Sequence, residues 1–568
     1  MQPSTNNYSI WKVISASSVG TLIEWYDFYI FGSLATIIAK QYFPDDAGTS
    51  ALLSTLAIFA AGFIVRPFGA LVFGRLGDLI GRKYTFLLTL VLMGTSTFAM
   101  GLVPGYKSIG VAAPLIVLLL RLVQGLALGG QYGGAATYVA EHAPKNRSGF
   151  FTSWIQTTAT LGLLLSFAVI RLTRNELGIE KFADWGWRIP FLLSAVLVIV
   201  SIYIRLRMKE SPIYTKLKSE GKTSSNPLKE SFTNKVNLKM VLLALFGATM
   251  GQGVIWYTGQ FYAQSFIENT CKVNFDDSRT VIMWAIVFAT PFFVIFGALS
   301  DKIGRKWIML FGMLLGVLTY NFIYGKFLEL TDPAAKREMV DAAKTTAVPK
   351  MASLDAKDKR KFLVVAKADS AYTDGAIYKF TKTDTVLLTN EFARATAPGN
   401  ADTVLALVAN AMDSKPADTS FIKLKPASAT AAAKTDTLFA GVEKKSVKPN
   451  VAIEKSLDSH TYWLMVFWVF VQIVYAAMVY GPIAAFLVEL FPTRIRYTSM
   501  SLPYHIGNGV FGGLVPFLST LIITYTHEPL SGLLYPVIVA AICFVIGTLY
   551  LTSGDNKDIS DEVNISVP

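Results

Sequence analysis

The sequence predicts an all-α membrane protein: twelve transmembrane helices in two pseudo-symmetric six-helix bundles, with an extracytoplasmic insert between the ninth and tenth helices. Three observations lead to this prediction. Of the 568 residues, 52% are hydrophobic and only 16% are charged, long apolar stretches recur along the chain, and one loop motif occurs twice. An ordinary soluble domain has about 25% charged residues. The composition therefore argues against a soluble enzyme and against a disordered chain.

Twelve stretches approach the length of about 20 apolar residues that a helix needs to cross a bilayer. Their apolar runs are continuous rather than alternating, which indicates helices and not barrel strands. The first stretch is too long for a cleavable signal peptide and carries two acids at its middle, so we expect it to remain as a span. The predicted spans are 16–38, 51–73, 84–103, 112–135, 150–171, 187–206, 239–262, 279–299, 307–325, 461–488, 498–524 and 530–552.

The basic residues predict how the spans are oriented. Nine lysines and arginines fall between Arg205 and Lys239, in the loop after the sixth span. Basic residues gather on the cytoplasmic side of a membrane protein, so we expect both termini in the cytoplasm. The net charge of +13 is then a topology signal that also favours contact with anionic lipid. We predict no nucleic-acid partner.

Two loop motifs repeat in the second half of the chain. Residues 74–83 (GRLGDLIGRK) and 297–306 (GALSDKIGRK) are identical at seven of ten positions, with an offset of 223. Residues 141–144 (EHAP) and 489–492 (ELFP) form a second pair, with an offset of 348. Such repeats indicate two related bundles. The offsets differ by 125, which indicates an insertion of about that length in the second half.

Composition places this insertion at 327–459, which contains no run long enough to cross a membrane. Alternating segments at 376–380 and 403–408 favour a small folded domain, and a flexible solvated loop is the alternative. The predicted organisation is a first bundle at 1–207, a cytoplasmic linker at 208–238, a second bundle at 239–326 and 460–553, the insert at 327–459, and a cytoplasmic tail at 554–568.

Glu24, Asp27 and Arg121 lie near the middle of predicted spans, where a charged residue costs about 2.5–3.5 kcal/mol. Glu24 and Asp27 are three residues apart and share one helix face. Two close carboxyl groups in a low dielectric disfavour a second negative charge, so one is suited to exchange a proton near neutral pH. Arg121, near the middle of 112–135, would bind a substrate carboxylate or pair with one of these acids. We predict that all three couple protons; a permanent structural ion pair is the alternative.

The motifs resemble those of the major facilitator superfamily. The segment 74–83 is similar to its G-x-L-x-D-x-x-G-R-K signature, and further motifs narrow the resemblance to the metabolite:proton symporter family, whose members carry α-ketoglutarate, citrate, shikimate, proline or betaine. These motifs are GTLIEWYDFY at 20–29, RPFG at 66–69, RLVQG at 121–125, GGQYGG at 129–134, WRIPF at 187–191 and ESP at 210–212. The resemblance covers nearly all the chain outside the insert. Gln131, where many relatives have Glu, and the long insert are departures from the pattern.

The resemblance implies a central cavity lined by the first, fourth, seventh and tenth helices, and it links an arginine like Arg121 to proton coupling. Polar and aromatic groups on the spans could hold a small polar solute by hydrogen bonds and stacking. The alternative to solute binding is that the aromatic residues pack at the membrane interface and that His505 is a buried packing group. The predicted substrate-binding residues are Arg121, Gln124, Gln131, Tyr132, Trp256, Tyr257, Gln260, Gln472, Tyr475, His505 and Asn508.

The repeated loops supply candidate gating residues, because the resemblance implies that such loops form a charge-relay latch at the inner gate. Arg66 lies nearer the cytoplasmic end of 51–73 and is as well placed to brace the gate as to touch the substrate. The predicted gating residues are Arg66, Asp78, Arg82, Asp301 and Arg305.

No motif indicates an enzyme. Residues 507–512 match G-x-G-x-x-G but fall inside a predicted span without a preceding strand, so they do not form a dinucleotide site. The chain has no phosphate-binding loop, and four histidines and two cysteines give no metal constellation. We therefore predict no cofactor and no metal.

Together these observations predict a secondary active transporter: proton-coupled symport of a small organic solute, expected to be a carboxylate, by alternating access. The expected partners are this solute, protons and the lipid bilayer, and the expected form is a monomer in a bacterial inner membrane. One alternative is uptake of a zwitterionic osmolyte such as proline or betaine. An alternative of another class is a transporter-like sensor or receptor that uses the insert.

Overall fold

The structure is a computed structural model, and two compact units make up the chain: unit 1 (1–270, 278–327 and 463–568) and unit 2 (271–277 and 328–462). Its described residues are 10–44, 47–80, 82–130, 132–144, 146–206, 219–220, 227–332, 347–353, 361–371, 376–388, 419–424, 438–443, 450–492 and 495–551.

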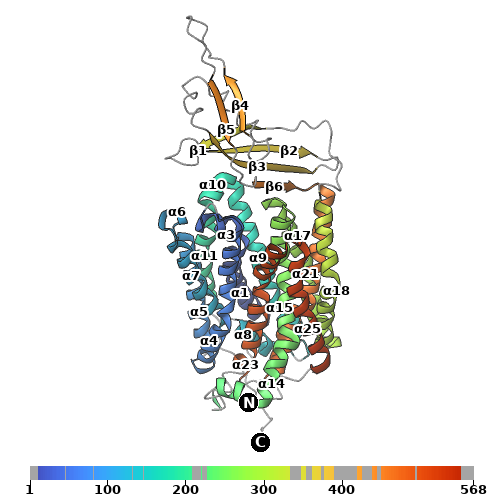
Figure 1. Cartoon of the computed structure of the whole chain (residues 1–568). Helices are drawn as coiled ribbons and strands as arrows, with labels where there is room; N and C mark the ends of the chain where they lie inside the picture. Colours follow the sequence, from blue (N-terminus) through green and yellow to red (C-terminus); the bar gives the residue numbers. More distant parts are fainter. Residues whose placement is uncertain are drawn as a thin grey trace, which may run out of the picture. The chain divides into compact units, whose positions relative to one another are not determined.

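The first half of unit 1 consists of helices that follow the apolar runs of the sequence. Figure 1 shows them side by side along most of their lengths. They are α1 (Ile10–Ser33), α2 (Ala35–Tyr42), α3 (Gly48–Ile64), α4 (Arg66–Ile80), α5 (Arg82–Leu102), α6 (Tyr106–Ile109), α7 (Ala112–Gly129), α8 (Tyr132–His142), α9 (Ser148–Leu177), α10 (Ile179–Asp184), η1 (Gly186–Arg188) and α11 (Ile189–Leu206).

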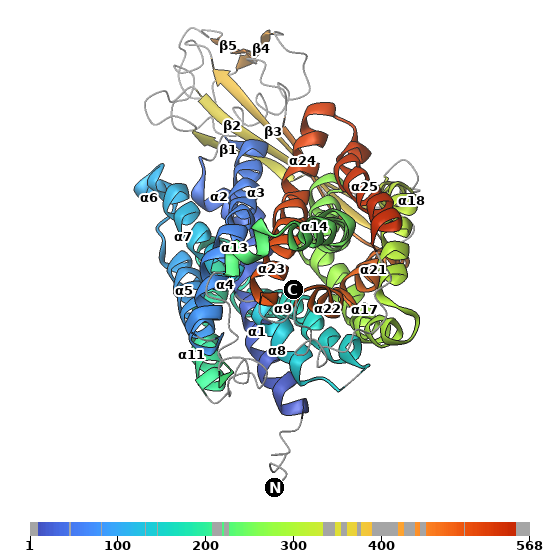
Figure 2. The ribbon, with the colours of Figure 1, turned by 90° about the horizontal axis from the view of Figure 1, so that it is seen from below.

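The second half repeats this pattern, with several turns of π-helix. Figure 2 shows its helices, coloured green and red, mainly on the side of unit 1 opposite the blue helices of the first half. They are α13 (Pro227–Thr233), α14 (Lys235–Ala244), η2 (Leu245–Thr249), α15 (Met250–Tyr257), η3 (Thr258–Tyr262), α16 (Ala263–Ser265), η4 (Phe266–Thr270), α17 (Phe275–Ile303), α18 (Arg305–Thr331), α21 (Ser459–Tyr480), α22 (Ile483–Leu490), α23 (Arg496–Tyr504), η6 (His505–Gly512), α24 (Val515–Thr526), η7 (Pro529–Leu533) and α25 (Leu534–Tyr550).

Ten helices among the described residues are long and apolar enough to cross a membrane, and a bent pair would make eleven. The predicted span 84–103 corresponds to the shorter apolar helix Leu87–Leu102. The prediction of one continuous helix over 16–38 is wrong. The chain leaves helical geometry at Leu34, where φ is −106° and ψ is 13°, and α1 and α2 meet at 61°.

Unit 1 has a strongly apolar surface, and charged and polar side chains are buried among the hydrophobic ones in its interior. Leu119, Ile199 and Leu318 are more than 60% exposed, as expected for side chains that face lipid tails. Asp27 and Arg121 are completely buried. Buried charge of this kind is costly, and in membrane proteins it marks substrate or ion pathways.

Unit 2 is a six-stranded antiparallel sheet with the strand order β1-β2-β3-β5-β4, in which β6 also pairs with β3. The alternating segment 376–380 lies at the start of β3, whereas the segment 403–408 lies outside the described residues. The strands are β1 (Ala347–Ser353), β2 (Lys361–Ala371), β3 (Ile377–Leu388), β4 (Thr419–Leu424), β5 (Leu438–Glu443) and β6 (Asn450–Ser456).

The loop before α17 is part of unit 2, because β6 binds it through backbone and side-chain hydrogen bonds. The backbone N–H of Lys455 donates to the carbonyl of Lys272 at 2.8 Å, and that of Asn274 donates to the carbonyl of Lys455 at 2.9 Å. Asp277 accepts a hydrogen bond from the backbone N–H of Leu457 at 3.0 Å. The first turn of α17 is therefore fixed to the end of the insert.

Candidate functional site

A buried carboxyl group lies in the C-terminal half of α1. Asp27 is completely buried, and neither of its oxygens has a hydrogen-bond partner among the described groups. Glu24, one turn earlier, is also buried. No ion pair joins Asp27 to Arg121 in the described structure, so the predicted pairing of these two residues is absent here. An unbonded acid in a dry interior is the feature that a proton-binding group requires.

Gln124 connects this acid to Arg121 on α7. Its Nε2 donates to the backbone carbonyl of Asp27 at 3.0 Å and to the hydroxyl of Thr97 at 2.8 Å, and its Oε1 accepts from Arg121 Nη1 at 2.5 Å. Both ends of the Gln124 amide are therefore occupied. In this structure Gln124 holds α7 to α1 and α5, which leaves its amide no free donor and no free terminal oxygen for a solute.

Arg121 is fixed by further contacts. Its guanidinium donates to the backbone carbonyls of Phe28 at 3.3 Å and Phe59 at 3.4 Å. The rings of Phe28, Phe31 and Phe59 lie 4.1–4.9 Å from the guanidinium carbon. The aromatic faces and the carbonyls together compensate a buried cation that has no acid partner among the described residues.

Arg66, the first residue of α4, lies within the same aromatic cluster. It is completely buried, and its guanidinium carbon lies 4.1 Å from the ring centre of Phe63, 4.2 Å from that of Phe28 and 5.6 Å from that of Trp25. Phe28 is thus shared by two guanidinium groups. This position groups Arg66 with the predicted substrate-binding residues, and its gating role stays a prediction.

The predicted residues of the seventh span face this cluster. Trp256 stacks on Tyr29 of α1, with ring centres 5.7 Å apart and planes at 27°, and Tyr29 stacks in turn on Trp25 at 5.0 Å. The indole N–H of Trp256, the hydroxyl of Tyr257 and the amide of Gln260 are buried without a hydrogen-bond partner among the described groups. The first and seventh spans therefore meet through aromatic faces beside unused polar groups.

Tyr132 and the eleventh span form the next layer of contacts. Tyr132 stacks on Tyr504 with ring centres 3.4 Å apart, and its hydroxyl accepts from Gln156 at 2.6 Å. Asn508 donates to the hydroxyl of Tyr504 at 3.1 Å and accepts from Gln252 at 3.1 Å. Both ring nitrogens of His505 are buried without a hydrogen-bond partner in the described structure. The two halves of unit 1 thus meet across this layer.

The remaining predicted binding residues are placed less centrally or fall outside the described part. Gln472 is buried and donates weakly, at 3.5 Å, to the carbonyl of Trp468 on its own helix. Tyr475 is half-buried, and its hydroxyl accepts from Thr319 of α18 at 3.4 Å. Gln131 lies outside the described residues. Within the described part of the chain, no group of three or more His, Cys, Asp or Glu side chains could hold a metal ion.

A network of charged groups joins the two halves at one end of unit 1. Asp301 of α17 accepts hydrogen bonds from the first backbone N–H groups of α9, with Oδ1 2.7 Å from the nitrogen of Gly149 and Oδ2 2.8 Å from that of Phe150. A carboxylate at a helix N-terminus is stabilised by these unpaired N–H groups and by the helix dipole. A helix of the second half thus caps a helix of the first half.

Arg305 extends this network to the second repeated motif. It lies 3.3 Å from Asp301, donates to Ser148 at 2.9 Å and pairs with Glu489. Gly149 allows α9 to approach α17 closely, because a Cβ at residue 149 would lie 2.5 Å from the carbonyl oxygen of Gly297. We name this network, made of Asp301, Arg305, Glu489, Ser148 and Gly149, the Asp301 closure. The side chains of Asp78 and Arg82 lie outside the described part of the structure.

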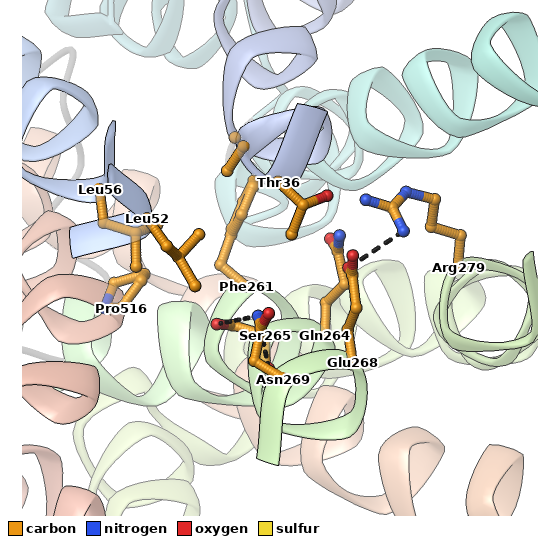
Figure 3. Close-up of a pocket in the computed structure, with 12 residues that line it drawn as sticks. Thr36, Leu52, Leu56, Phe261, Gln264, Ser265, Glu268, Asn269, Arg279 and Pro516 are labelled. Carbon is orange, nitrogen blue, oxygen red and sulfur yellow. Dashed lines mark hydrogen bonds and ion pairs between the residues drawn. The ribbon is translucent and has the colours of Figure 1, made fainter. Parts of the chain in front are cut away.

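A second contact between the halves lies 22 residues earlier on α17, about 33 Å away at 1.5 Å per residue. Arg279 donates to the carbonyl oxygen of Ser33 from Nη2 at 2.6 Å and from Nε at 3.2 Å, and it pairs with Glu268 at 3.0 Å. Figure 3 shows Arg279 and Glu268 joined at the edge of a small pocket that Thr36 and Phe261 also line. We name this contact the Arg279 closure.

Several of these residues were not predicted from the sequence. Glu268 follows one apolar run and Arg279 begins the next, so the two opposite charges are only 11 residues apart in the sequence. This proximity could have predicted their ion pair. Glu489 was noted only as a repeat marker. Its counterpart Glu141 lies 3.9 Å from Arg496, so both repeated glutamates are in ion pairs.

Buried charges inside a bundle of apolar spans, with contacts between two halves at both ends, define a multi-pass membrane transport protein. Residues 12–230 match the family described as Sugar (and other) transporter. The inner membrane metabolite transport protein YhjE of Escherichia coli (strain K12) is 36% identical over 327 residues, which cover 57% of this chain and 74% of that protein. The alpha-ketoglutarate permease of the same organism is 36% identical over 311 residues, or 55% of this chain and 70% of that protein.

A proline/betaine transporter of Salmonella typhimurium (strain LT2) is 33% identical over 313 residues, which cover 53% of this chain and 61% of that protein. Among solved structures, the xylose transporter XylE from E. coli, in a partially occluded inward open conformation, aligns with a TM-score of 0.57 at 14% identity. That alignment covers 96% of this chain and 99% of XylE, and it shows the shared fold alone. The chain belongs to the major facilitator superfamily, and it is a transporter and not an enzyme. The predicted resemblance is confirmed.

Proposed function

We propose that this protein is a secondary active transporter that moves a small organic carboxylate together with a proton by alternating access. The observation that carries this proposal is Asp27, whose completely buried carboxyl group has no hydrogen-bond partner in the described structure. Gln124 links the backbone carbonyl of Asp27 to the buried cation Arg121. Burial penalises a charged carboxylate, so binding a proton from one side of the membrane and releasing it to the other would be tied to changes in hydration.

Charge balance supports a carboxylate as the solute. Arg66 and Arg121 are both buried beside Phe28, and neither has an acid partner among the described residues. An anionic solute would offset this excess of positive charge. The similarity to an alpha-ketoglutarate permease is in accord with such a solute. A membrane potential contributes about 2.3 kcal/mol per charge per 100 mV, which is enough to drive accumulation.

The two closures suit alternating access. We propose that the Asp301 closure and the Arg279 closure open in turn, so that the chamber between them faces one side of the membrane at a time. In this proposal the chain has twelve spans, both termini and the Asp301 closure are cytoplasmic, and the insert is extracytoplasmic. Asp78 and Arg82 of the first repeat would act with Asp301 and Arg305 of the second, and a monomer in contact with lipid would suffice.

Uptake by proteoliposomes with an imposed proton gradient tests the proposal. We expect accumulation of a radiolabelled carboxylate such as α-ketoglutarate when the gradient is present, and only equilibration when an ionophore collapses it. Asp27→Asn keeps the size of the side chain and removes its proton exchange. Equal accumulation with and without the gradient would reject proton coupling.

The aromatic faces favour one alternative. Trp25, Tyr29 and Trp256 form a stacked row, and such rings attract quaternary ammonium groups. A zwitterion such as betaine or proline would place its cationic end there, as the similarity to a proline/betaine transporter suggests. Competition separates the two solutes. If the protein carries an osmolyte, excess betaine should block its uptake; if it carries a dicarboxylate, excess betaine should leave dicarboxylate uptake unchanged.

A sensor role for the insert predicts that deleting 331–457 abolishes function, whereas intact transport would make the insert accessory.

A further inference from the structure

One buried cation in unit 1, Arg66, makes no hydrogen bond to the described groups. None of the three guanidinium nitrogens of Arg66 has a hydrogen-bond partner among the described groups, although the residue is completely buried. A buried charge without a partner is costly, so such groups are usually paired or hydrogen-bonded. A cation that the protein leaves unpaired at this cost is suited to a ligand that supplies the missing acceptors.

The other buried arginines differ from Arg66 in this respect. Arg121 donates to two carbonyls and to Gln124, Arg279 donates to Ser33 and Glu268, and Arg305 pairs with Asp301 and Glu489. Each of them holds helices together through oxygen acceptors. Arg66 makes no such bond to the described residues, and aromatic rings contact its charge instead.

The contacts that Arg66 does make leave its N–H groups available. Phe28, Phe63 and Trp25 approach the guanidinium with their rings. Aromatic rings attract the cation electrostatically but offer no oxygen to its five N–H donors, which form a fork that fits a carboxylate. The rings therefore stabilise the charge, and the N–H groups of the fork have no oxygen acceptor among the described groups.

Further donors surround the guanidinium from both halves of unit 1. Tyr257 of α15 packs edge-to-face on Phe63 at 5.1 Å, and Tyr29 of α1 stacks on Trp25 at 5.0 Å, so both tyrosines lie next to rings that contact Arg66. Their hydroxyl groups are buried without a hydrogen-bond partner by geometric criteria in the described structure. From η6, a Cβ added at Gly509 would lie 3.5 Å from the Cδ of Arg66. A ligand held here would contact the first, second, seventh and eleventh spans together.

We propose that Arg66 binds the carboxylate group of the transported solute through its guanidinium fork, with the hydroxyls of Tyr29 and Tyr257 as additional donors and the Trp25 and Trp256 rings as the surface for the rest of the solute. This inference rests on the proposed carboxylate transport and assigns the specificity for a carboxylate to Arg66. Arg121 is then a positioning residue, because both of its terminal nitrogens already donate to protein oxygens.

Ligand binding to the full-length detergent-purified protein, without any proton gradient, tests the assignment. A thermal-shift screen of α-ketoglutarate, citrate, shikimate, proline and glycine betaine selects the carboxylate that binds the wild type best, and calorimetry gives its Kd. The same measurements on its methyl ester report binding that needs no charge. The variants are Arg66→Gln and Arg66→Lys, and Arg171→Gln, on the exposed surface of α9, is the matched control.

We expect Arg66→Gln to weaken carboxylate binding at least thirtyfold and to leave ester binding within threefold of the wild type. Arg66→Lys keeps the charge but not the fork, so we expect a loss of about tenfold. Tyr257→Phe, which preserves the ring, should weaken carboxylate binding by three- to tenfold, and Arg171→Gln should bind as the wild type does.

Carboxylate binding that survives Arg66→Gln within threefold overturns the inference, as does a wild type that prefers the ester or binds no carboxylate of the panel. If Arg66→Gln does not give a monodisperse protein, Tyr257→Phe and Arg66→Lys decide by the same criterion. The proposed proton coupling is tested independently. Wild-type uptake that is equal with and without a gradient would reject coupling, while a Kd that depends on Arg66 would still support Arg66 as the carboxylate-binding residue.

Discussion

Removing the charge of Asp301 should open the contact between α9 and α17. Asp301→Asn keeps the side-chain shape but replaces two charge-assisted hydrogen bonds, at 2.7 and 2.8 Å, by one neutral bond. Hydrogen bonds to a charged group contribute about 1.5–3 kcal/mol and neutral ones about 1 kcal/mol, and the helix dipole adds a further 0.3–1 kcal/mol. The low end of these values, about 2 kcal/mol, corresponds to a roughly 30-fold shift from the closed toward the open form.

Alkylation of a reporter cysteine measures this shift. Ser153 is completely buried on α9, and a Cβ added at Gly297 of α17 would lie 2.5 Å from the Cβ of Ser153. A cysteine in place of Ser153 (Ser153→Cys) should therefore react only when α9 and α17 separate. With Cys271 and Cys543 replaced by serine, we expect Asp301→Asn to raise the rate of maleimide labelling about 30-fold in proteoliposomes. An unchanged rate would refute the assignment of Asp301 as part of a closure.

A matched substitution controls for the general effect of a lost charge. Asp184, at the end of α10, is exposed. Asp184→Asn should therefore leave the labelling rate of Ser153→Cys unchanged. If both variants accelerated labelling equally, the effect would reflect net charge and not the cap on α9.

Further substitutions test the other parts of the site. Asp27→Asn should abolish gradient-driven accumulation while solute exchange in the absence of a gradient continues, as measured by counterflow; accumulation at the wild-type level would contradict a proton-binding role. A cysteine introduced near the break at Ser33 should be labelled at least fivefold faster in the Arg279→Gln variant than in the wild-type background, and Arg279→Lys should accelerate labelling less. Equal labelling rates in both variants and the wild type would argue against the Arg279 closure. Gly149→Val places a side chain 2.5 Å from the carbonyl of Gly297, so transport should fall at least tenfold; wild-type transport would show that α9 and α17 need not approach. Burial raises the pKa of the Cys271 thiol to about 12, so little reactive thiolate exists at pH 8 and alkylation should be at least 100-fold slower than in denatured protein; fast labelling of folded protein would contradict the described loop.

The sequence predicted most helices well because lipid leaves the chain few choices. A backbone inside hydrocarbon must satisfy its own hydrogen bonds, so a long apolar run that crosses a membrane becomes a helix. The buried acid Asp27 and the cation Arg121 were found for the same reason: charge inside such a run stands out against its neighbours. Both features can be recognised from residues close together in the chain.

Features that depend on distant partners were not predicted. The break after Ser33 has no proline, and the freed carbonyl is satisfied by Arg279, 246 residues later. Gln124 was predicted to bind the solute because it follows Arg121 at helical spacing, but its amide is occupied by Arg121, Thr97 and the backbone of Asp27. Periodicity identifies the face of a helix, whereas the partner on that face is set by the packing of the whole bundle.

The two ends of the insert lie close together within unit 2, and this has an evolutionary consequence. Lys455 Nζ donates to the carbonyl of Thr331 at 2.6 Å, and the hydroxyl of Tyr378 donates to the same oxygen at 3.3 Å. The chain therefore leaves α18 and returns to α21 at neighbouring points, although more than a hundred residues separate them. A module whose ends meet in this way can be gained, lost or exchanged between lineages without rerouting any helix, and a short hairpin could take its place.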